Sequence, residues 1–229
     1  MNRRNAIGGL LLLPGALLGM AAAQDAPAAA RAAYDAGVAH LKQKRTAAGI
    51  ASLREAVRLF PDYFDAQFAL AVELGRRDDR IEEALGALEQ ARRLRDRDPR
   101  VYFLFGTLMA RQRKFAVAEL AFREAIDRDP MNPQSYFSRA LTLIELAAAA
   151  GKGSEKEKAA RLDEADRDLN RALILSGRRM FAAYLQLARV REQRGDRRAA
   201  AEMLETYLKH QPNDPNAAAI REAIARLRD

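Results

Sequence analysis

Few residues of this chain are of a type and spacing that could perform chemistry. Its 229 residues include no cysteine, and its two histidines, His40 and His210, are far apart in the sequence. The lack of cysteine excludes disulfides, thiolate nucleophiles and cysteine-ligated metals. Since nothing else in the sequence points to a metal site or an acid–base centre, we expect neither a metal nor a cofactor.

Adjacent carboxylates are the remaining candidates for acid–base chemistry. They occur at Asp78-Asp79 and Glu82-Glu83. A helical surface offers such neighbours by chance, so we interpret these pairs as solvated turn residues. The sequence also lacks a glycine-rich phosphate loop, a G-x-S-x-G elbow and an H-E-x-x-H motif. It therefore predicts a protein that is not an enzyme.

The composition favours helices throughout the chain. Alanine, leucine, arginine and glutamate dominate, and β-branched residues are sparse. The 8 prolines and 13 glycines are few, as expected of breaks between helices. The chain is long enough to bury a sizeable core.

The formal net charge of +8 raises the possibility of a nucleic-acid partner. Much of this charge is arginine in stretches where basic and acidic residues are interspersed, such as residues 89–98. Such stretches usually form solvated helix faces with i,i+4 ion pairs. We therefore expect no nucleic acid, and a basic nucleic-acid-binding helical repeat protein is kept as an alternative.

The first 23 residues have the three parts of a secretory signal peptide. Arg3 and Arg4 form a positive start, residues 6–20 are an apolar run, and residues 21–23 are a small-residue site. The run is shorter than the ~20 residues that a membrane-spanning helix needs. No cysteine follows it, which excludes a lipoprotein anchor.

We expect cleavage after Ala23, a linker at residues 24–29 and a mature protein that is periplasmic or secreted in a bacterium, without a stable membrane span. Removal of the leader would leave a net charge of +6, from 37 basic minus 31 acidic residues. The arginine pair leaves the general secretory and twin-arginine routes both open. An uncleaved N-terminal anchor is the alternative to cleavage.

Aromatic residues recur at a nearly constant interval along the rest of the chain. Tyr34, Phe68, Phe103 and Phe137 follow one another at steps of 34, 35 and 34 residues. This period is longer than any helical or strand repeat, and it has the length of one supersecondary unit. The chain is therefore predicted to be an array of stacked units.

Residues 99–132 form the clearest unit. Two apolar stripes at helical spacing are separated by a polar turn at residues 112–114, and a proline ends the second stripe. The stripes consist of Tyr102, Phe105, Gly106 and Met109, then of Ala118, Phe122 and Ala125. Together with Phe115, this pattern resembles the tetratricopeptide repeat, a helix–turn–helix unit. In that family, the small residues at Gly106 and Ala118 let the two helices approach closely.

The resemblance covers about residues 30–228 and implies an all-α fold. This fold is a right-handed α-solenoid domain, residues 30–229, of about five helix–turn–helix repeats with a C-terminal capping helix. The repeats are expected at residues 30–63, 64–98, 99–132, 133–180 and 181–214, and the capping helix at 215–228. The last repeat departs from the family pattern at Arg191 and Tyr207.

The fourth repeat contains an insertion of roughly 14 residues relative to the family's repeat length. We interpret residues 151–153 as its turn and Ser154 as the N-cap of the following helix. Both helices of this repeat should therefore be long and project beyond their neighbours. We interpret the insertion, residues 147–162, as a surface elaboration, with a docking element as the alternative.

The resemblance also implies a concave groove lined by the first helix of each repeat. In this register an aromatic residue is followed one turn later by an aliphatic residue or threonine, and one turn beyond that usually by a base. The expected groove residues are Tyr34, Val38 and Lys42, then Phe68, Val72 and Arg76, then Phe103, Thr107 and Arg111, then Phe137, Leu141 and Glu145, and finally Leu185, Arg189 and Gln193.

We expect a scaffold or adaptor that binds a peptide or protein partner in this groove. Aromatic anchors and basic rims suit a ligand with apolar side chains and some acidic character. The family's carboxylate clamp is not expected, because Val38, Val72 and Leu141 stand where it uses asparagine. Alternatively, each aromatic ring only packs its own helix. The alternative function is an accessory subunit of an envelope enzyme or assembly machine.

Overall fold

The computed structural model describes residues 26–151 and 154–229. This part of the chain forms eleven α-helices and one short 3-10 helix, and it contains no strand. The helices are α1 (Ala28–Lys42), α2 (Thr46–Leu59), α3 (Phe64–Gly75), α4 (Ile81–Leu94), α5 (Pro99–Arg111), α6 (Phe115–Arg128), α7 (Pro133–Ala148), α8 (Glu155–Leu175), α9 (Phe181–Gln193), α10 (Arg197–His210) and α11 (Ala217–Arg228), with η1 (Asp78–Arg80) before α4.

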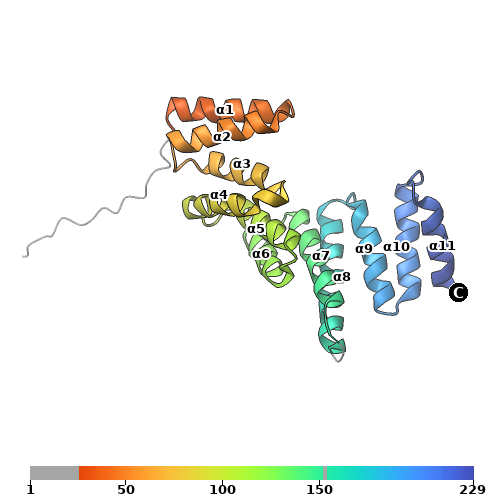
Figure 1. Cartoon of the computed structure of the whole chain (residues 1–229). Coiled ribbons are helices and arrows are strands. Elements are labelled where there is room, and N and C mark those ends of the chain that lie inside the picture. Colours follow the sequence, from red (N-terminus) through yellow and green to blue (C-terminus); the bar gives the residue numbers. More distant parts are fainter. Residues whose placement is uncertain (1–25, 152–153) are drawn as a thin grey trace, which may run out of the picture.

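Consecutive helices pair as five hairpins, from α1–α2 to α9–α10, and α11 packs on the last hairpin. Figure 1 shows the hairpins side by side in one curved row, with α1 at one end and α11 at the other. Each hairpin contacts the next one along the chain. The predicted all-α solenoid of five helical hairpins with a C-terminal helix is confirmed.

Three of the hairpins turn through the same backbone geometry. In each, the second residue after the end of the first helix has a positive φ in the left-handed region. The amide of the following residue then donates to a carbonyl five residues earlier, which closes a Schellman-type helix end. The positive-φ residues are Lys44, Arg113 and Gly195, and the hydrogen bonds are Arg45 to His40, Lys114 to Met109 and Asp196 to Arg191, each at 2.9 Å.

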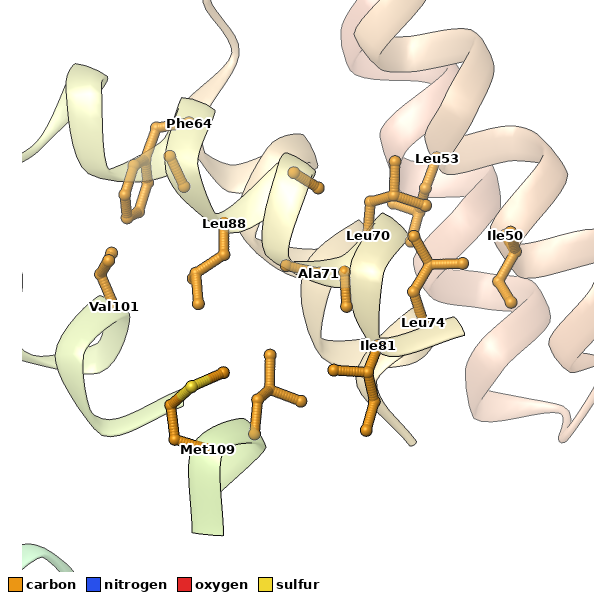
Figure 2. Close-up of a cluster of buried hydrophobic side chains, with 14 of the residues drawn as sticks. Ile50, Leu53, Phe64, Leu70, Ala71, Leu74, Ile81, Leu88, Val101 and Met109 are labelled. Carbon is orange, nitrogen blue, oxygen red and sulfur yellow. The ribbon is translucent and has the colours of Figure 1, made fainter. Parts of the chain in front are cut away.

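The core consists of apolar side chains buried between neighbouring hairpins. Figure 2 shows part of it, where Ile50 and Leu53 of α2 lie near Leu70 and Leu74 of α3. This cluster continues through α4 and α5 to Phe122 of α6. A second cluster joins α7 to α10, and a small third one joins α10 to α11. Each hairpin thus covers the apolar face of the hairpin before it.

The two helices of the third hairpin approach closely at Gly106. A Cβ atom added there would lie 2.8 Å from the Phe122 ring, and Phe122 is itself buried. Ala118 is fully buried in the same hairpin. The small residues of the repeat pattern therefore set the spacing between α5 and α6.

The fourth hairpin is longer than the others. Helix α7 has 16 residues and α8 has 21, and Figure 1 shows the pair extending past its neighbours. Ser154 directly precedes α8, but its side chain makes no capping hydrogen bond among the described residues. Two polar contacts join the helices: Arg161 Nη1 donates to the Leu146 carbonyl at 3.0 Å, and Arg139 Nε donates to the buried Asp168 carboxylate at 2.6 Å. Part of the expected turn, residues 152–153, lies outside the described residues.

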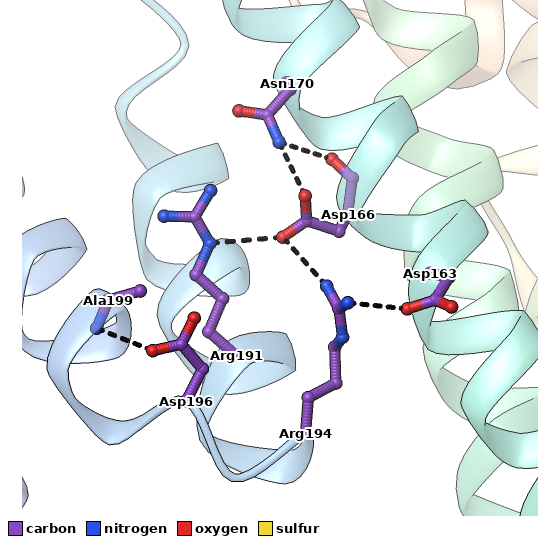
Figure 3. Close-up of polar contacts among 7 residues, drawn as sticks. All are labelled: Asp163, Asp166, Asn170, Arg191, Arg194, Asp196 and Ala199. Carbon is purple, nitrogen blue, oxygen red and sulfur yellow. Dashed lines mark hydrogen bonds and ion pairs between the residues drawn. The ribbon is translucent and has the colours of Figure 1, made fainter.

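A polar network ties this long hairpin to the next one. Arg191 Nε of α9 donates to the Asp166 carboxylate of α8 at 3.1 Å, and Arg194 pairs with Asp163 at 2.8 Å. Asn170 Nδ2 also donates to Asp166, at 2.8 Å (Figure 3). Arg191 departs from the repeat pattern because it supplies this inter-hairpin ion pair.

The predicted leader, residues 1–23, lies outside the described residues. Helix α1 begins at Ala28, within the segment expected to be a linker. None of the helices in the described part of the chain is long and apolar enough to cross a membrane.

Two glycine substitutions test the close approach of α5 and α6. We expect Gly106→Ala to lower the free energy of unfolding by about 1–3 kcal/mol, because the added methyl group would overlap the buried Phe122 ring. Gly86→Ala in α4 is the matched control, since its added Cβ would meet nothing within 4 Å beyond the adjacent residues and the local backbone of its own helix. It should instead stabilise the helix by roughly 0.5–1 kcal/mol. Urea unfolding measures both, and equal effects of the two substitutions would contradict the packing described.

Candidate partner-binding groove

The first helices of the second to fifth hairpins form one continuous face. Helix α3 contacts α5, α5 contacts α7, and α7 contacts α9. Within the expected sets of three groove residues, the first and second side chains are half-buried, except that Arg189, the second residue of the last set, is exposed. The third is exposed in every set except the fourth, where Glu145 is half-buried. The face is therefore accessible, with its apolar residues packed at the base.

Aromatic rings and arginines gather at the N-terminal end of this face. The rings of Tyr34 and Tyr63 lie 5.3 Å apart. The ring of Phe68 stacks on that of Phe64, with centroids 5.9 Å apart. The guanidinium of Arg100 lies 5.1 Å from the Phe68 centroid, within the range of a cation–π contact. The second and third hairpins are thus joined through a ring that the sequence assigned to the groove.

Asp98 holds Arg100 in this position and is the N-cap residue of α5. Its carboxylate accepts a hydrogen bond from the Arg100 backbone amide at 3.0 Å, as an N-cap does, and from Arg100 Nη2 at 2.7 Å. The hydrogen bond from the Arg100 side chain lowers the pKa of Asp98 from its ordinary value. Asp98 therefore stays ionised and keeps the guanidinium fixed next to the aromatic rings.

The centre of the face contains a hollow of about 300 Å³ between α5 and α7. Thr107 and Arg111 line it from α5, and Leu141 and Glu145 line it from α7. The structure thus brings together four expected groove residues from two repeats. Phe103 lies one turn earlier, with its ring centroid 5.6 Å from that of Phe122. Its ring therefore packs its own hairpin while remaining partly accessible.

Several bases expected at the rim are engaged by the protein itself. Arg111 donates to the Gly75 carbonyl and pairs with Asp78. Arg76 pairs with Glu73 at 3.1 Å, and Arg189 lies 4.0 Å from Glu145. Arg111 consequently caps the C-terminal end of α3 and links two hairpins, which lessens its contribution to a basic rim.

A second hollow, of about 630 Å³, lies at the C-terminal end of the face. Leu185 and Arg189, the groove residues expected from the last repeat, line it together with residues of α10 and α11. Gln193 is exposed at the end of α9. The sequence assigned α11 a capping role only, whereas in the structure it also forms a wall of this hollow.

The carboxylates considered for acid–base chemistry form structural contacts. Asp79 pairs with Arg77 at 2.8 Å, and Glu83 pairs with Arg54 of the first hairpin. Glu82 accepts a hydrogen bond from Gln112 Nε2 at 3.1 Å. Among the described residues, no three histidine, aspartate or glutamate side chains gather in an arrangement that could hold a metal ion.

One hollow has no counterpart in the sequence analysis. It has a volume of about 530 Å³, lies between α4, α5 and α6, and is lined mainly by apolar side chains. Val117 and Leu120 of α6 line it with 41 % and 49 % of their surface exposed. Both residues lie outside the buried stripe of α6, and this was the feature of the sequence that could have revealed the hollow.

Comparisons with known proteins agree with this architecture. A family model described as tetratricopeptide repeat matches residues 16–64, 36–99, 68–133 and 103–152. The matches together span more than half of the 229 residues, and the fifth hairpin lies beyond them. No curated protein matches the chain.

Solved structures with the same fold include three of low sequence identity to this chain. MamA from Desulfovibrio magneticus RS-1 is 13% identical with a TM-score of 0.68, covering 82% of this chain and 99% of that one. PilF of Pseudomonas aeruginosa is 20% identical, with a TM-score of 0.61 and coverage of 87% and 91%. YrrB, described as a TPR protein with an unusual peptide-binding site, is 16% identical, with a TM-score of 0.61 and coverage of 83% and 90%. At these identities the likeness shows the fold alone.

The contribution of Asp98 should depend on pH. Because its folded-state pKa is lowered, the carboxylate stabilises the fold above its ordinary pKa of about 4, and this effect is lost as the pH falls through the folded-state value. Asp98→Asn keeps an N-cap acceptor but removes the ion pair with Arg100. We expect this variant to unfold at lower urea than the unmodified protein at pH 7, with the difference shrinking between about pH 5 and pH 3.

Asp96→Asn is the control for this titration. Asp96 is exposed and forms no ion pair with a described residue, so its replacement should leave the urea midpoint nearly unchanged at each pH. A difference for Asp98→Asn that stays constant from neutral to acidic pH would show that the ion pair does not stabilise the fold.

Proposed function

Because the chain belongs to the tetratricopeptide repeat family, we propose that it is a non-catalytic scaffold that binds a peptide or protein partner in the groove formed by α1, α3, α5, α7 and α9. Proteins of this family generally mediate protein–protein interactions and are typically non-catalytic. The structural neighbour YrrB is described as having a peptide-binding site. Stacked hairpins leave an extended surface uncovered, which suits an extended or helical ligand.

The central hollow is the observation that carries this proposal. Thr107, Arg111, Leu141 and Glu145 come from two repeats that are adjacent in the array, and they line one cavity on the groove face. Its walls combine methyl groups with a hydroxyl, a guanidinium and a carboxylate. Ligand sites are commonly built in this way, with apolar walls and a few polar groups that fix orientation, and a peptide side chain can be held by the same combination.

The chemistry of the face favours a ligand with apolar anchors and some acidic character. Half-buried Tyr34 and Phe68 supply rigid rings, exposed Arg100 supplies positive charge beside Phe68, and exposed Lys42 supplies another positive charge at the end of α1. Since Asp98 already accepts from Arg100, an acidic ligand group would share this guanidinium with it. We therefore propose that apolar contacts provide most of the affinity and that charge favours acidic partners.

We further propose that the scaffold acts in the bacterial periplasm or envelope. The support is the layout of residues 1–23, with its arginine pair, its apolar run and its small-residue site. Removal of this segment would leave the hairpins unaltered, because α1 begins at Ala28.

A pair of leucine-to-arginine variants tests which face binds the partner. Leu141→Arg places a long charged side chain in the central hollow, whereas Leu120→Arg places one on the apolar hollow beside α6. With a photo-crosslinking residue at position 107, we expect a discrete adduct in native cells. Leu141→Arg should reduce it at least tenfold, about 1.4 kcal/mol of binding free energy. Leu120→Arg should leave it unchanged.

Circular dichroism of both variants controls for loss of fold. The groove proposal would be wrong if the adduct survived Leu141→Arg and were lost with Leu120→Arg, because the partner would then occupy the other face.

Mass spectrometry of the mature protein tests the proposed export. After expression in a bacterial host and osmotic release of the periplasm, the released protein should begin at Gln24. An Arg3→Glu/Arg4→Glu variant should accumulate in the cytoplasm at full length, because the positive start of the leader is lost. Recovery of the unmodified protein with its N-terminus at Met1 or Asn2 would overturn the cleavage proposal.

A further inference from the structure

The hollow at the C-terminal end of the groove has an apolar base formed by three different helices. Leu185 of α9, Leu204 of α10 and Leu227 of α11 line it. Leu227 is buried, and the other two are half-buried. At about 630 Å³, the hollow has the size of a small-ligand or side-chain site and is large enough for an aliphatic side chain.

Positive charge surrounds this base. The lining includes three arginines, Arg189, Arg197 and Arg226, against one acidic residue, Glu192, which gives a net charge of +2 (three minus one). Arg197 and Arg226 form no ion pair with any carboxylate in the described part of the chain. Arg189 lies 4.0 Å from Glu145, a long and weak pairing. The end of the groove therefore differs from its centre, where Arg111 is occupied by Asp78.

Helix α11 organises these charges. Arg197 Nη2, at the start of α10, donates a hydrogen bond to the Arg226 carbonyl near the end of α11. This contact holds the Arg197 guanidinium against the backbone of Arg226, whose own guanidinium also lines the hollow. Tyr207 of α10 donates to the Asp214 carboxylate just before α11, which fixes the connection between the two helices.

From this arrangement we infer that the hollow is a subsite for an acidic side chain flanked by an aliphatic one, in a peptide bound along the groove. This inference rests on the proposed function and names the chemistry of the partner. A guanidinium donates two parallel hydrogen bonds to a carboxylate, and the bond strengthens next to apolar walls that exclude water. Leu185, Leu204 and Leu227 would receive the aliphatic neighbour.

The subsite is continuous with the rest of the groove. Leu185 and Arg189 lie on α9, which contacts α7, and Glu145 at the edge of the central hollow approaches Arg189. A ligand that occupies the central hollow can therefore extend along α9 to α11. Its acidic residue would be excluded from the vicinity of Glu145 and attracted to Arg197 and Arg226.

Titration of the isotope-labelled protein with short peptides tests the inference by NMR. The probe is N-acetyl-Ala-Leu-Glu-amide, whose only carboxylate is the side chain, and the matched neutral peptide is N-acetyl-Ala-Leu-Gln-amide. We expect the acidic probe to shift the amide signals of Gly195 and Ala223, which line the hollow. The neutral peptide should bind at least tenfold more weakly.

Two arginine variants assign the effect to the subsite. Arg226→Ala should lower the affinity for the acidic probe about tenfold, because it removes one of the guanidinium groups. Arg221→Ala is the matched control, since Arg221 is exposed on the same helix and does not line the hollow. It should leave the affinity unchanged, and circular dichroism should show the same helix content for both variants.

Several outcomes would overturn the inference. Equal binding of the two peptides would do so, as would the absence of shifts at Gly195 and Ala223 up to millimolar probe. Tighter binding of N-acetyl-Ala-Leu with a free C-terminus would show that the hollow recognises a terminal carboxylate and not an acidic side chain. Shifts confined to Thr107 and Leu141 would reject the subsite and support the groove. The crosslinking at position 107 tests the groove separately, so the two failures can be told apart.

Discussion

The structure depends on the burial of each hairpin's apolar face against the next hairpin. Leu53 and Leu74 are fully buried although they belong to different hairpins, so neither hairpin could exclude water alone. Burial of such side chains contributes roughly 1.5–3 kcal/mol each, and it requires a neighbour at every position in the array. Two consequences follow. The last hairpin needs a covering helix, and the face formed by the first helices is left open because no further layer from residues 26–151 or 154–229 packs on it.

Polar contacts add specificity to this apolar stacking, and they explain where the arginines are. Arg111 joins the third hairpin to the second, and Arg191 joins the fifth to the fourth. From the sequence alone, both arginines would be interpreted as solvent-exposed positive charges. The Arg111–Asp78 pair is largely exposed and contributes little by itself, and desolvation offsets much of the attraction in the partly buried Arg191–Asp166 pair. The main effect of both pairs is therefore to fix the relative position of neighbouring hairpins. The charge available to a ligand is consequently uneven along the groove, because Arg197 and Arg226 at its C-terminal end have no carboxylate partner among the described residues.

The fold could be predicted from the sequence because its determinants are local and periodic. The spacing of Gly106 and Phe122 within one repeat specifies a contact that the structure contains. Other features depend on residues distant in sequence. Lys44 and Arg113 occupy left-handed positions that glycine usually takes, so the residue types there gave no indication of the turn geometry. The pairing of Arg111 with Asp78 could not be predicted without the position of η1. The contribution of α11 to the hollow could not be predicted without the packing of α9, α10 and α11.

Helix α11 therefore links stability to binding. Leu227 belongs to the small core that α11 shares with Ala200 and Ala201 of α10, and it also lines the C-terminal hollow. With so few buried side chains, α11 is held more weakly than the hairpins in the middle of the array. A ligand in contact with Arg226 and Leu227 would bind only when α11 is docked, and it would stabilise that state by mass action. The helix that closes the array would then also complete the site at which a ligand is held.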